Sequence, residues 1–199
     1  MTQAMNVCVA RKLRGLIFSL EAMTERQFYD WQTSGGGGEV LLLIETLEHA
    51  EIPWCVIGGL AVNYWAEESI ATADVDLAIA GDELEQAIGL LEAAGFRSSR
   101  HAYTVNLKGR SAISVQISTE PVYLDFPSRS VPADVHGILM RVSCLEDTIQ
   151  GKILAWRDSE RRSSKRQKDF LDIMRLVESH PHLADSLPED VLAALQNAN

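Results

Sequence analysis

Cysteine is scarce in this chain of 199 residues, and its three cysteines, Cys8, Cys55 and Cys144, stand far apart. An odd number of cysteines without a C-x-x-C pair excludes a disulfide framework and a cysteine-bound zinc site. No apolar run approaches the roughly 20 residues that a membrane-spanning helix needs. The basic and apolar residues 11–18 are too few for a signal peptide and lack a cleavage site. We therefore expect a cytoplasmic protein that has no membrane partner.

An excess of basic residues is also absent, because the formal net charge is −10. This charge excludes a protein that binds nucleic acid over its whole surface. One stretch of the sequence is nevertheless rich in basic residues and contains Lys152, Arg157, Arg161, Arg162, Lys165, Arg166 and Lys168. The stretch is either a surface that binds RNA or nucleotide phosphates or the solvated face of a helix, and the sequence leaves both open.

The length and composition fit one globular domain with a small extension, since 46% of the residues are hydrophobic and 23% are charged. We expect a helical extension over residues 1–33, a core over residues 39–142, and a C-terminal helical part over residues 143–199 that packs on the core. A capping box at Thr24 predicts a short helix over residues 24–31. The glycines at 35–38 predict a flexible linker, because no Gly-Lys-Ser/Thr follows them as in a phosphate-binding loop.

Apolar periodicity and turn residues predict a mixture of helices and strands in the rest of the chain. Strands are expected at 54–57, 74–79, 101–107, 112–118 and 138–142, and residues 108–110 predict a hairpin between the third and the fourth. Helices are expected at 39–50, 60–65, 82–94, 143–157 and 164–179, and in a last short stretch after Pro188. Residues 121–132 are expected to be irregular.

The chemically informative part is the strand at 54–57, which ends in Gly58-Gly59, and the Asp74-Val75-Asp76 sequence on the next strand. Residues i and i+2 of a strand lie on one face about 6–7 Å apart, and two carboxylates there repel each other unless a cation lies between them. Magnesium takes one or two carboxylates together with substrate phosphates. A Gly-Gly turn at a helix start exposes backbone N–H groups to a phosphate. The pattern predicts a triphosphate at the glycine turn and a metal on Asp74 and Asp76, and its alternative is an exposed edge strand with two solvated acids.

A resemblance to a known family rests on two segments, Ile57-Gly58-Gly59-Leu60-Ala61-Val62-Asn63-Tyr64-Trp65 and Ala71-Thr72-Ala73-Asp74-Val75-Asp76-Leu77. They resemble the minimal nucleotidyltransferase family of the DNA polymerase beta superfamily, in the group that contains the toxins of type IV (abortive-infection) toxin–antitoxin systems. The resemblance continues in Gly151-Lys152-Ile153-Leu154-Ala155 and in Lys168-Asp169-Phe170-Leu171-Asp172. It covers residues 39–178 and leaves the N-terminal part outside.

This resemblance implies an α+β fold of the nucleotidyltransferase type, in which a small mixed sheet is flanked by helices and followed by C-terminal helices. It implies Mg2+ or Mn2+ and the transfer of a nucleotide from a nucleoside triphosphate to a hydroxyl of an RNA, a protein or a small molecule. Gly58 and Gly59 would contact the triphosphate, and Lys152 would reach its phosphates or its base. Asp74 and Asp76 would be catalytic residues that bind the metal. A toxin of this group would also have an antitoxin partner.

The sequence departs from the family at the third carboxylate, which lies on a later strand and helps to activate the acceptor hydroxyl. The matching strand offers Gln116, which cannot accept a proton at neutral pH, and Asp125 is the nearest catalytic substitute. Ala73 also stands where relatives commonly have a basic residue. These departures leave open an alternative function, a catalytically inactive binding module of the same fold.

Lys168, Asp169 and Asp172 are expected to lie on one face of the helix at 164–179. One interpretation is local ion pairing within the helix, Lys168 with Asp172 and Lys165 with Asp169. The other is support of the phosphate site from behind. The sequence alone does not separate them.

Overall fold

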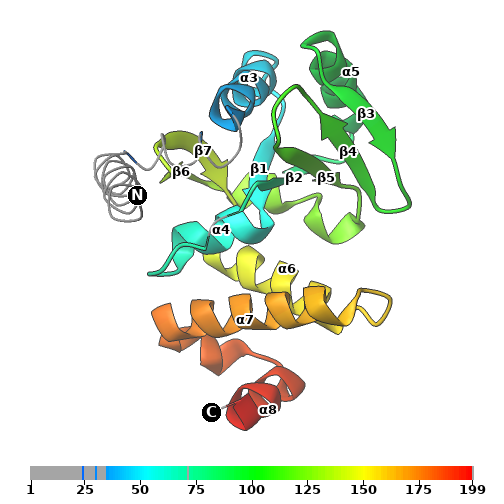
Figure 1. The fold of residues 1–199 in the computed structure, drawn as a ribbon. Helices are drawn as coiled ribbons and strands as arrows, with labels where there is room; N and C mark the ends of the chain where they lie inside the picture. Colours follow the sequence, from blue (N-terminus) through cyan, green and yellow to red (C-terminus); the bar gives the residue numbers. More distant parts are fainter. Residues whose placement is uncertain (1–23, 25–29, 31–34, 71, 199) are drawn as a thin grey trace, which may run out of the picture.

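The computed structural model describes Thr24, Asp30, residues 35–70 and residues 72–198. Its centre is a mixed sheet of seven strands in the order β3-β4-β5-β2-β1-β7-β6 (Figure 1). β2 pairs with β5 and β1 with β7 in parallel, and the other neighbours are antiparallel. The strands are β1 (Trp54–Ile57), β2 (Asp74–Ile79), β3 (Arg97–Arg100), β4 (Thr104–Lys108), β5 (Ser114–Ser118), β6 (Val131–Val135) and β7 (Ile138–Val142). The expected α+β fold with a mixed sheet is confirmed.

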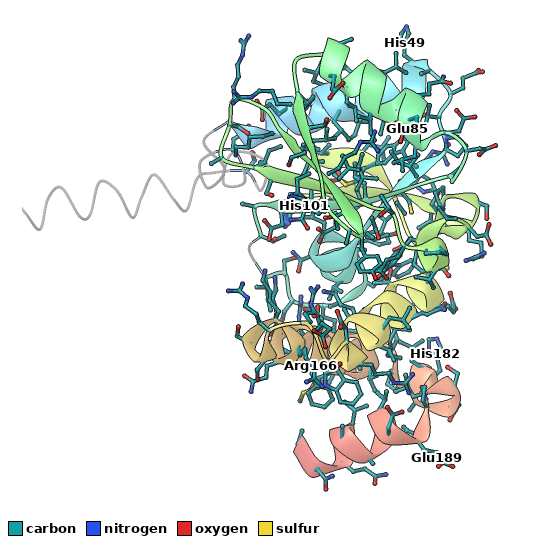
Figure 2. All side chains as sticks on the ribbon, turned by 90° about the vertical axis from the view of Figure 1, so that its right-hand side faces the viewer. His49, Glu85, His101, Arg166, His182 and Glu189 are labelled. Atoms are coloured by element: carbon teal, nitrogen blue, oxygen red, sulfur yellow. The ribbon has the colours of Figure 1, made fainter. Side chains whose placement is uncertain are left out.

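Helices lie on both sides of this sheet (Figure 1). α3 (Gly36–His49) and α5 (Leu84–Ala93) cover one face, and α4 (Gly58–Trp65) lies on the other side. Beyond α4 lie α6 (Leu145–Arg157), α7 (Ser163–Ser179) and α8 (Glu189–Ala198), which form a separate layer in the side view of Figure 2. Three short 3-10 helices complete the described part, η1 (Pro121–Tyr123), η2 (Phe126–Arg129) and η3 (Pro181–Ser186).

The two faces of the sheet differ because side chains alternate along each strand. Val75, Leu77 and Ile79 of β2 are buried in the main core together with apolar residues of α3 and α5. Asp74 and Asp76 therefore lie on the opposite face, which looks toward α6 and α7. The polar residues of β4 and β5 that lie between buried apolar ones share that face, namely Thr104, Asn106, Ser114, Gln116 and Ser118.

The C-terminal helices pack on α4 through a second apolar cluster. Val62 and Ala66 contribute to it from the α4 side, and buried residues of α6, α7, η3 and α8 fill the rest. The indole Nε1 of Trp65 donates a hydrogen bond to the Ser143 carbonyl oxygen at 3.0 Å. The expected start of the helix at residue 143 is wrong, because α6 begins at Leu145 with Cys144 as its N-cap, and the Ser143 hydroxyl bonds to Thr148.

The expected linker at 35–38 is also wrong, because Gly36 begins α3. Gly35 takes the left-handed conformation, with φ of 87°, that turns the chain into the helix. The Gly37 amide donates to the Asp30 carboxylate at 2.8 Å, which satisfies one of the free N–H groups of the first helical turn. The extension predicted over 1–33 and the helix over 24–31 lie outside the described residues, apart from Thr24 and Asp30.

Two strands were not expected from the sequence, β3 and β6. β6 contains Pro132, which cannot donate to a strand ladder, and it is tolerated because β6 is an edge strand of the sheet. The hairpin predicted around residues 108–110 is confirmed as β4 and β5. Cys55 and Cys144 carry free thiols. No helix in the described ranges is long and apolar enough to cross a membrane.

Glu39 of α3 holds the β4–β5 turn against the helix. Its carboxylate accepts hydrogen bonds from the Ser111 hydroxyl at 2.6 Å, from the Ser111 amide at 3.0 Å, and from the Arg110 amide. Burial by itself would raise the pKa of Glu39, but the hydrogen bonds from Ser111 and Arg110 outweigh it and hold the pKa below its usual range. Glu39 therefore stabilises the fold in its ionised form.

We predict that Glu39→Gln lowers the free energy of unfolding by about 1 kcal/mol at neutral pH, because hydrogen bonds to an ionised group are stronger than those to an amide. Since the folded-state pKa is lowered, the difference from wild type is largest above the ordinary glutamate pKa and shrinks as the pH falls. Urea unfolding at several pH values measures it. Glu45→Gln, an exposed change on the same helix, is the control. Equal effects of the two variants would contradict the prediction.

Candidate functional site

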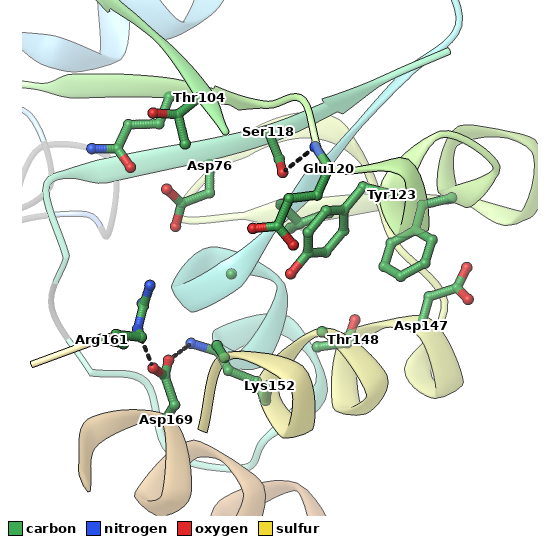
Figure 3. A pocket seen from close by; sticks show the side chains of 16 residues that line it. Asp76, Thr104, Ser118, Glu120, Tyr123, Asp147, Thr148, Lys152, Arg161 and Asp169 are labelled. Carbon is green, nitrogen blue, oxygen red and sulfur yellow. Dashed lines mark hydrogen bonds and ion pairs between the residues drawn. The ribbon is translucent and has the colours of Figure 1, made fainter. Parts of the chain in front are cut away.

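A cleft lies between the polar face of the sheet and helices α6 and α7 (Figure 3). It consists of two adjoining hollows. Both are lined by Asp76, Gln116, Lys152, Arg161 and Asp169, so these residues form their common wall. Gly58 lines one hollow and Gly59 the other. The cleft thus brings together residues from β2, β5, the β1–α4 turn, α6 and α7.

Asp74 and Asp76 lie on the same face of β2 and line the same hollow as Gly59. Asp76 is half-buried, and burial raises its pKa above the usual aspartate range. The positive charge of Lys152 opposes this shift, and the carboxylate of Asp74 adds to it. A divalent cation would be stabilised here, because burial and the neighbouring carboxylate both disfavour the ionised form of Asp76.

Gly58 is required by the position of Asp76. The antiparallel register places Asp76 opposite Ile57, immediately before the glycine turn. Gly58 has a φ of 67°, and a β-carbon at this position would overlap the Asp76 carboxylate. Any other residue would therefore be strained and would displace Asp76. Gly59 has more room, because its β-carbon would meet only Thr72, at 3.7 Å.

Gln116 lies directly beside Asp76, because the two residues are paired in the parallel register of β2 and β5. Its side-chain amide forms no hydrogen bond with any residue that the structure describes, and it borders both hollows. Asn106 of β4 is its neighbour on the other side. The structure thus places a neutral amide next to the first pair of carboxylates.

Asp125 does not reach the cleft. It is exposed at the N-terminal end of η2 and is absent from the lining of both hollows. The structure therefore does not bring together Asp125 and the aspartates of β2. The physical reason is that the chain turns through η1 between β5 and Asp125, which carries Asp125 away from the sheet face.

Lys152 of α6 borders the cleft, but its ammonium group is already engaged. It forms ion pairs with Asp172 at 2.7 Å and with Asp169 at 3.1 Å. Burial disfavours the charged form, but the carboxylates of Asp172 and Asp169 outweigh it, so the pKa of Lys152 is raised. Removing Lys152 would leave buried carboxylates without their cation, a change that typically costs 3–5 kcal/mol, roughly. Its contact with phosphates stays a prediction.

Neither Asp169 nor Asp172 pairs with Lys165 or Lys168: Asp169 pairs only with residues outside α7, whereas Asp172 pairs with Lys152 of α6 and with Arg175 of its own helix. Besides Lys152, Asp169 binds Arg161 at 2.8 Å, and Asp172 binds Arg175 at 2.9 Å. The local pairs Lys168–Asp172 and Lys165–Asp169 are therefore not the ones formed. The two buried aspartates instead fix α6 against α7 beneath the cleft.

Lys165 and Lys168 line the hollow that contains Asp74 and Asp76. Neither ammonium group forms an ion pair or hydrogen bond with a described residue. Arg161 joins them at the same hollow. The basic stretch of the sequence thus contributes at least three positive side chains to the cleft, where an anion could bind.

Glu120 and Tyr123 are cleft residues that the sequence analysis missed. Both line the hollow that contains Gly58 (Figure 3). Burial raises the pKa of Tyr123 to about 12, with further contributions from the negative charges of Glu120 and Asp76. A signal for Glu120 existed in the sequence, because it follows Gln116 by four residues and keeps the period of the strand.

The described residues contain no group of three or more histidine, cysteine, aspartate or glutamate side chains that could hold a metal ion. The donors available on β2 and β5 are two carboxylates and one amide oxygen, all hard oxygen ligands. A Mg2+ ion commonly uses one or two carboxylates and completes its coordination with water and substrate phosphates. The residues present therefore fit a metal that is bound together with its substrate.

Comparison with solved structures finds the same fold in nucleotidyltransferases. The crystal structure of ANT(2'')-Ia in complex with adenylyl-2''-tobramycin is 15% identical in sequence, covers 81% of this chain and 94% of that chain, and has a TM-score of 0.51. The solution structure of the antibiotic-resistance factor ANT(2'')-Ia is 14% identical in sequence, and the match covers 80% of this chain and 88% of that chain with a TM-score of 0.51. The crystal structure of a candidate nucleotidyltransferase from H. pylori is 17% identical in sequence, and the match covers 79% of this chain and 72% of that chain with a TM-score of 0.50. The expected nucleotidyltransferase fold is confirmed.

Comparison with protein families gives a match over most of the chain. The model of the nucleotidyl transferase AbiEii toxin family, of type IV toxin–antitoxin systems, matches residues 43–199. The match includes the glycine turn, both aspartates of β2 and the C-terminal helices. A search of curated proteins gives no match.

We predict that Asp76→Asn raises the melting temperature at neutral pH in the presence of a chelator. Because the folded-state pKa of Asp76 is raised, its ionised form destabilises the fold at neutral pH, and the neutral amide removes this cost. The difference should vanish near the ordinary aspartate pKa of about 4, where Asp76 is protonated. Calorimetric melting at several pH values checks both statements. Asp125→Asn, at an exposed position, should change little, and a lower melting temperature for Asp76→Asn would contradict the prediction.

Proposed function

Because the chain belongs to the nucleotidyl transferase AbiEii toxin family of type IV toxin–antitoxin systems, we propose that it moves a nucleotide from a nucleoside triphosphate to a hydroxyl group. The acceptor is an RNA, a protein or a small molecule, and the reaction uses Mg2+ or Mn2+. One observation carries the proposal. The paired aspartates of β2 lie against a glycine turn in a cleft that also holds four basic side chains, Lys152, Arg161, Lys165 and Lys168.

Asp74 and Asp76 would hold the metal, with the amide oxygen of Gln116 beside them. When bound, the metal would neutralise negative charge on the transferred phosphoryl group. The raised pKa of Asp76 supports this assignment, because a cation would offset the cost of ionising a half-buried carboxylate next to Asp74. These two residues are the ones that we assign to metal binding.

Gly58 and Gly59 begin α4, so their backbone N–H groups are not used within the helix. The positive end of the helix dipole favours an anion at this point. We assign the triphosphate to this turn, where the absence of side chains lets phosphate oxygens approach the backbone. The adjoining Lys165 and Lys168, which pair with no described residue, would offset the remaining negative charge of the phosphates.

Lys152 and Arg161 would contribute positive charge to the same region. Asp169 holds both of them by ion pairs, so their positions are fixed before the substrate arrives. Such fixed charges lower the energy of a developing negative charge without reorganisation during the reaction. Lys152 would act on the phosphates from this position.

An antitoxin that opposes the activity is the partner expected from the family.

Gln116 favours a second candidate function, a catalytically inactive module that binds a nucleoside triphosphate. It lies on β5 beside Asp76, where the resemblance to the family leads us to expect the third carboxylate, and an amide cannot take a proton at neutral pH. An assay for the transfer of a labelled nucleotide from its triphosphate to an acceptor distinguishes the two functions.

We predict that the protein transfers label from at least one α-phosphate-labelled nucleoside triphosphate to total RNA or lysate components in the presence of Mg2+ or Mn2+. Asp76→Asn and added chelator should each reduce transfer by at least 100-fold, roughly the loss expected when a group that stabilises charge is removed. Asp125→Asn, which removes an exposed carboxylate outside the cleft, should retain transfer. Metal-dependent binding of triphosphate without any transfer would favour the inactive module.

A further inference from the structure

The two hollows of the cleft differ in their chemistry on either side of Asp76. The basic hollow contains Asp74, Lys165 and Lys168 together with Gly59 and Thr72. The hydroxyl hollow contains Thr104, Ser118, Glu120, Tyr123 and Thr148. If the proposed function holds, the strongly negative triphosphate lies in the basic hollow. The acceptor must then approach from the hydroxyl hollow, because the attacking and leaving oxygens lie roughly in line.

Glu120 stands on the same face as Gln116 although β5 ends at Ser118. The extended chain continues past the strand, since the Thr119 amide donates to the Tyr103 carbonyl oxygen at 2.9 Å. Glu120 itself has extended torsion angles, with φ of −70° and ψ of 135°. The alternation of the strand therefore places Gln116, Ser118 and Glu120 along one row that faces the cleft.

The side chain of Glu120 extends into the hydroxyl hollow toward the hydroxyl of Tyr123 (Figure 3). The Tyr123 ring is held against α6, because a β-carbon at Gly151 would lie 3.3 Å from the ring. The negative charge of Glu120 is the second cause, after burial, of the raised pKa of Tyr123. Glu120 is thus close to a fixed aromatic wall of the hollow.

Four carboxylates that the structure describes line the hydroxyl hollow, and three of them have another role. Asp147 accepts two hydrogen bonds from the Arg129 guanidinium, both at 3.0 Å. Asp169 is bound by Lys152 and Arg161. Asp76 faces the proposed metal. The Glu120 carboxylate forms no ion pair and accepts no hydrogen bond from a described residue. It is therefore the carboxylate that is available to a substrate.

We propose that Glu120 is the general base of the transfer reaction and replaces the carboxylate that is missing at Gln116. Its carboxylate takes the proton of the acceptor hydroxyl as the acceptor oxygen bonds to the α-phosphorus. The bond from the α-phosphorus to the leaving oxygen breaks, and pyrophosphate departs with its electron pair. Gln116 stays neutral beside Asp76 throughout.

The test compares Glu120→Gln, Glu120→Asp and the control Asp125→Asn with wild type in the labelled-triphosphate assay. Glu120→Gln should lower the transfer rate at saturating triphosphate by about 100- to 10,000-fold, the usual contribution of a general base. Glu120→Asp, which keeps an acid, should retain more activity than Glu120→Gln. Binding of Mn2+ with a non-hydrolysable triphosphate, measured by calorimetry, should be unchanged in both. Asp125→Asn should match wild type in both measurements.

Three outcomes would overturn the proposal. Glu120→Gln could transfer label as fast as wild type, which leaves the proposed function standing and removes Glu120 from the chemistry. Glu120→Gln could lose triphosphate binding to the same extent as transfer, which would make Glu120 a binding or structural residue. Wild type could bind metal and triphosphate but transfer no label to total RNA or lysate, and then the proposed function fails together with its base.

Discussion

The position of the Asp76 carboxylate constrains the whole site. It occupies the space next to Gly58 that a β-carbon would need, so the glycine turn and the acidic strand determine each other. The antiparallel pairing of Ile57 with Asp76 places Asp76 beside the glycine turn, and the parallel pairing of Asp76 with Gln116 places Gln116 beside Asp76. The backbones of β1, β2 and β5 thus fix the glycine turn, Asp76 and Gln116 relative to one another before any ligand binds. Sites on paired strands are held more precisely than sites on loops.

Charge is distributed so that the acids and bases of the cleft serve different purposes. Asp169 and Asp172 are buried and hold Lys152, which fixes α6 against α7. Asp74 and Asp76 have no such partner among the described residues and face unpaired lysines across one hollow. The buried ammonium group of Lys152 is therefore used to hold the helical layer together. The acids of β2 remain available to a metal, and the lysines of α7 to phosphates.

The sequence was sufficient for the central pattern because the pattern is local. A buried strand that ends in two glycines and a second strand with alternating acids predict the fold class, the turn and the shared face of Asp74 and Asp76. Contacts between distant segments could not be predicted in this way. Periodicity suggested pairing of Asp169 and Asp172 within their helix, whereas Lys152 of the preceding helix binds both. Glu120 was missed because the extended chain continues past the apolar residues that define β5. β6 was missed because Pro132 marks an irregular segment unless the strand lies at an edge.

The most direct measurement is calorimetric titration of a non-hydrolysable nucleoside triphosphate, with and without Mn2+, into wild type and into the double variant Asp74→Asn/Asp76→Asn. If the two aspartates share one ion, wild type binds the triphosphate in the presence of the metal, and the folded double variant loses this metal-dependent binding. Equal binding by both proteins would contradict the account.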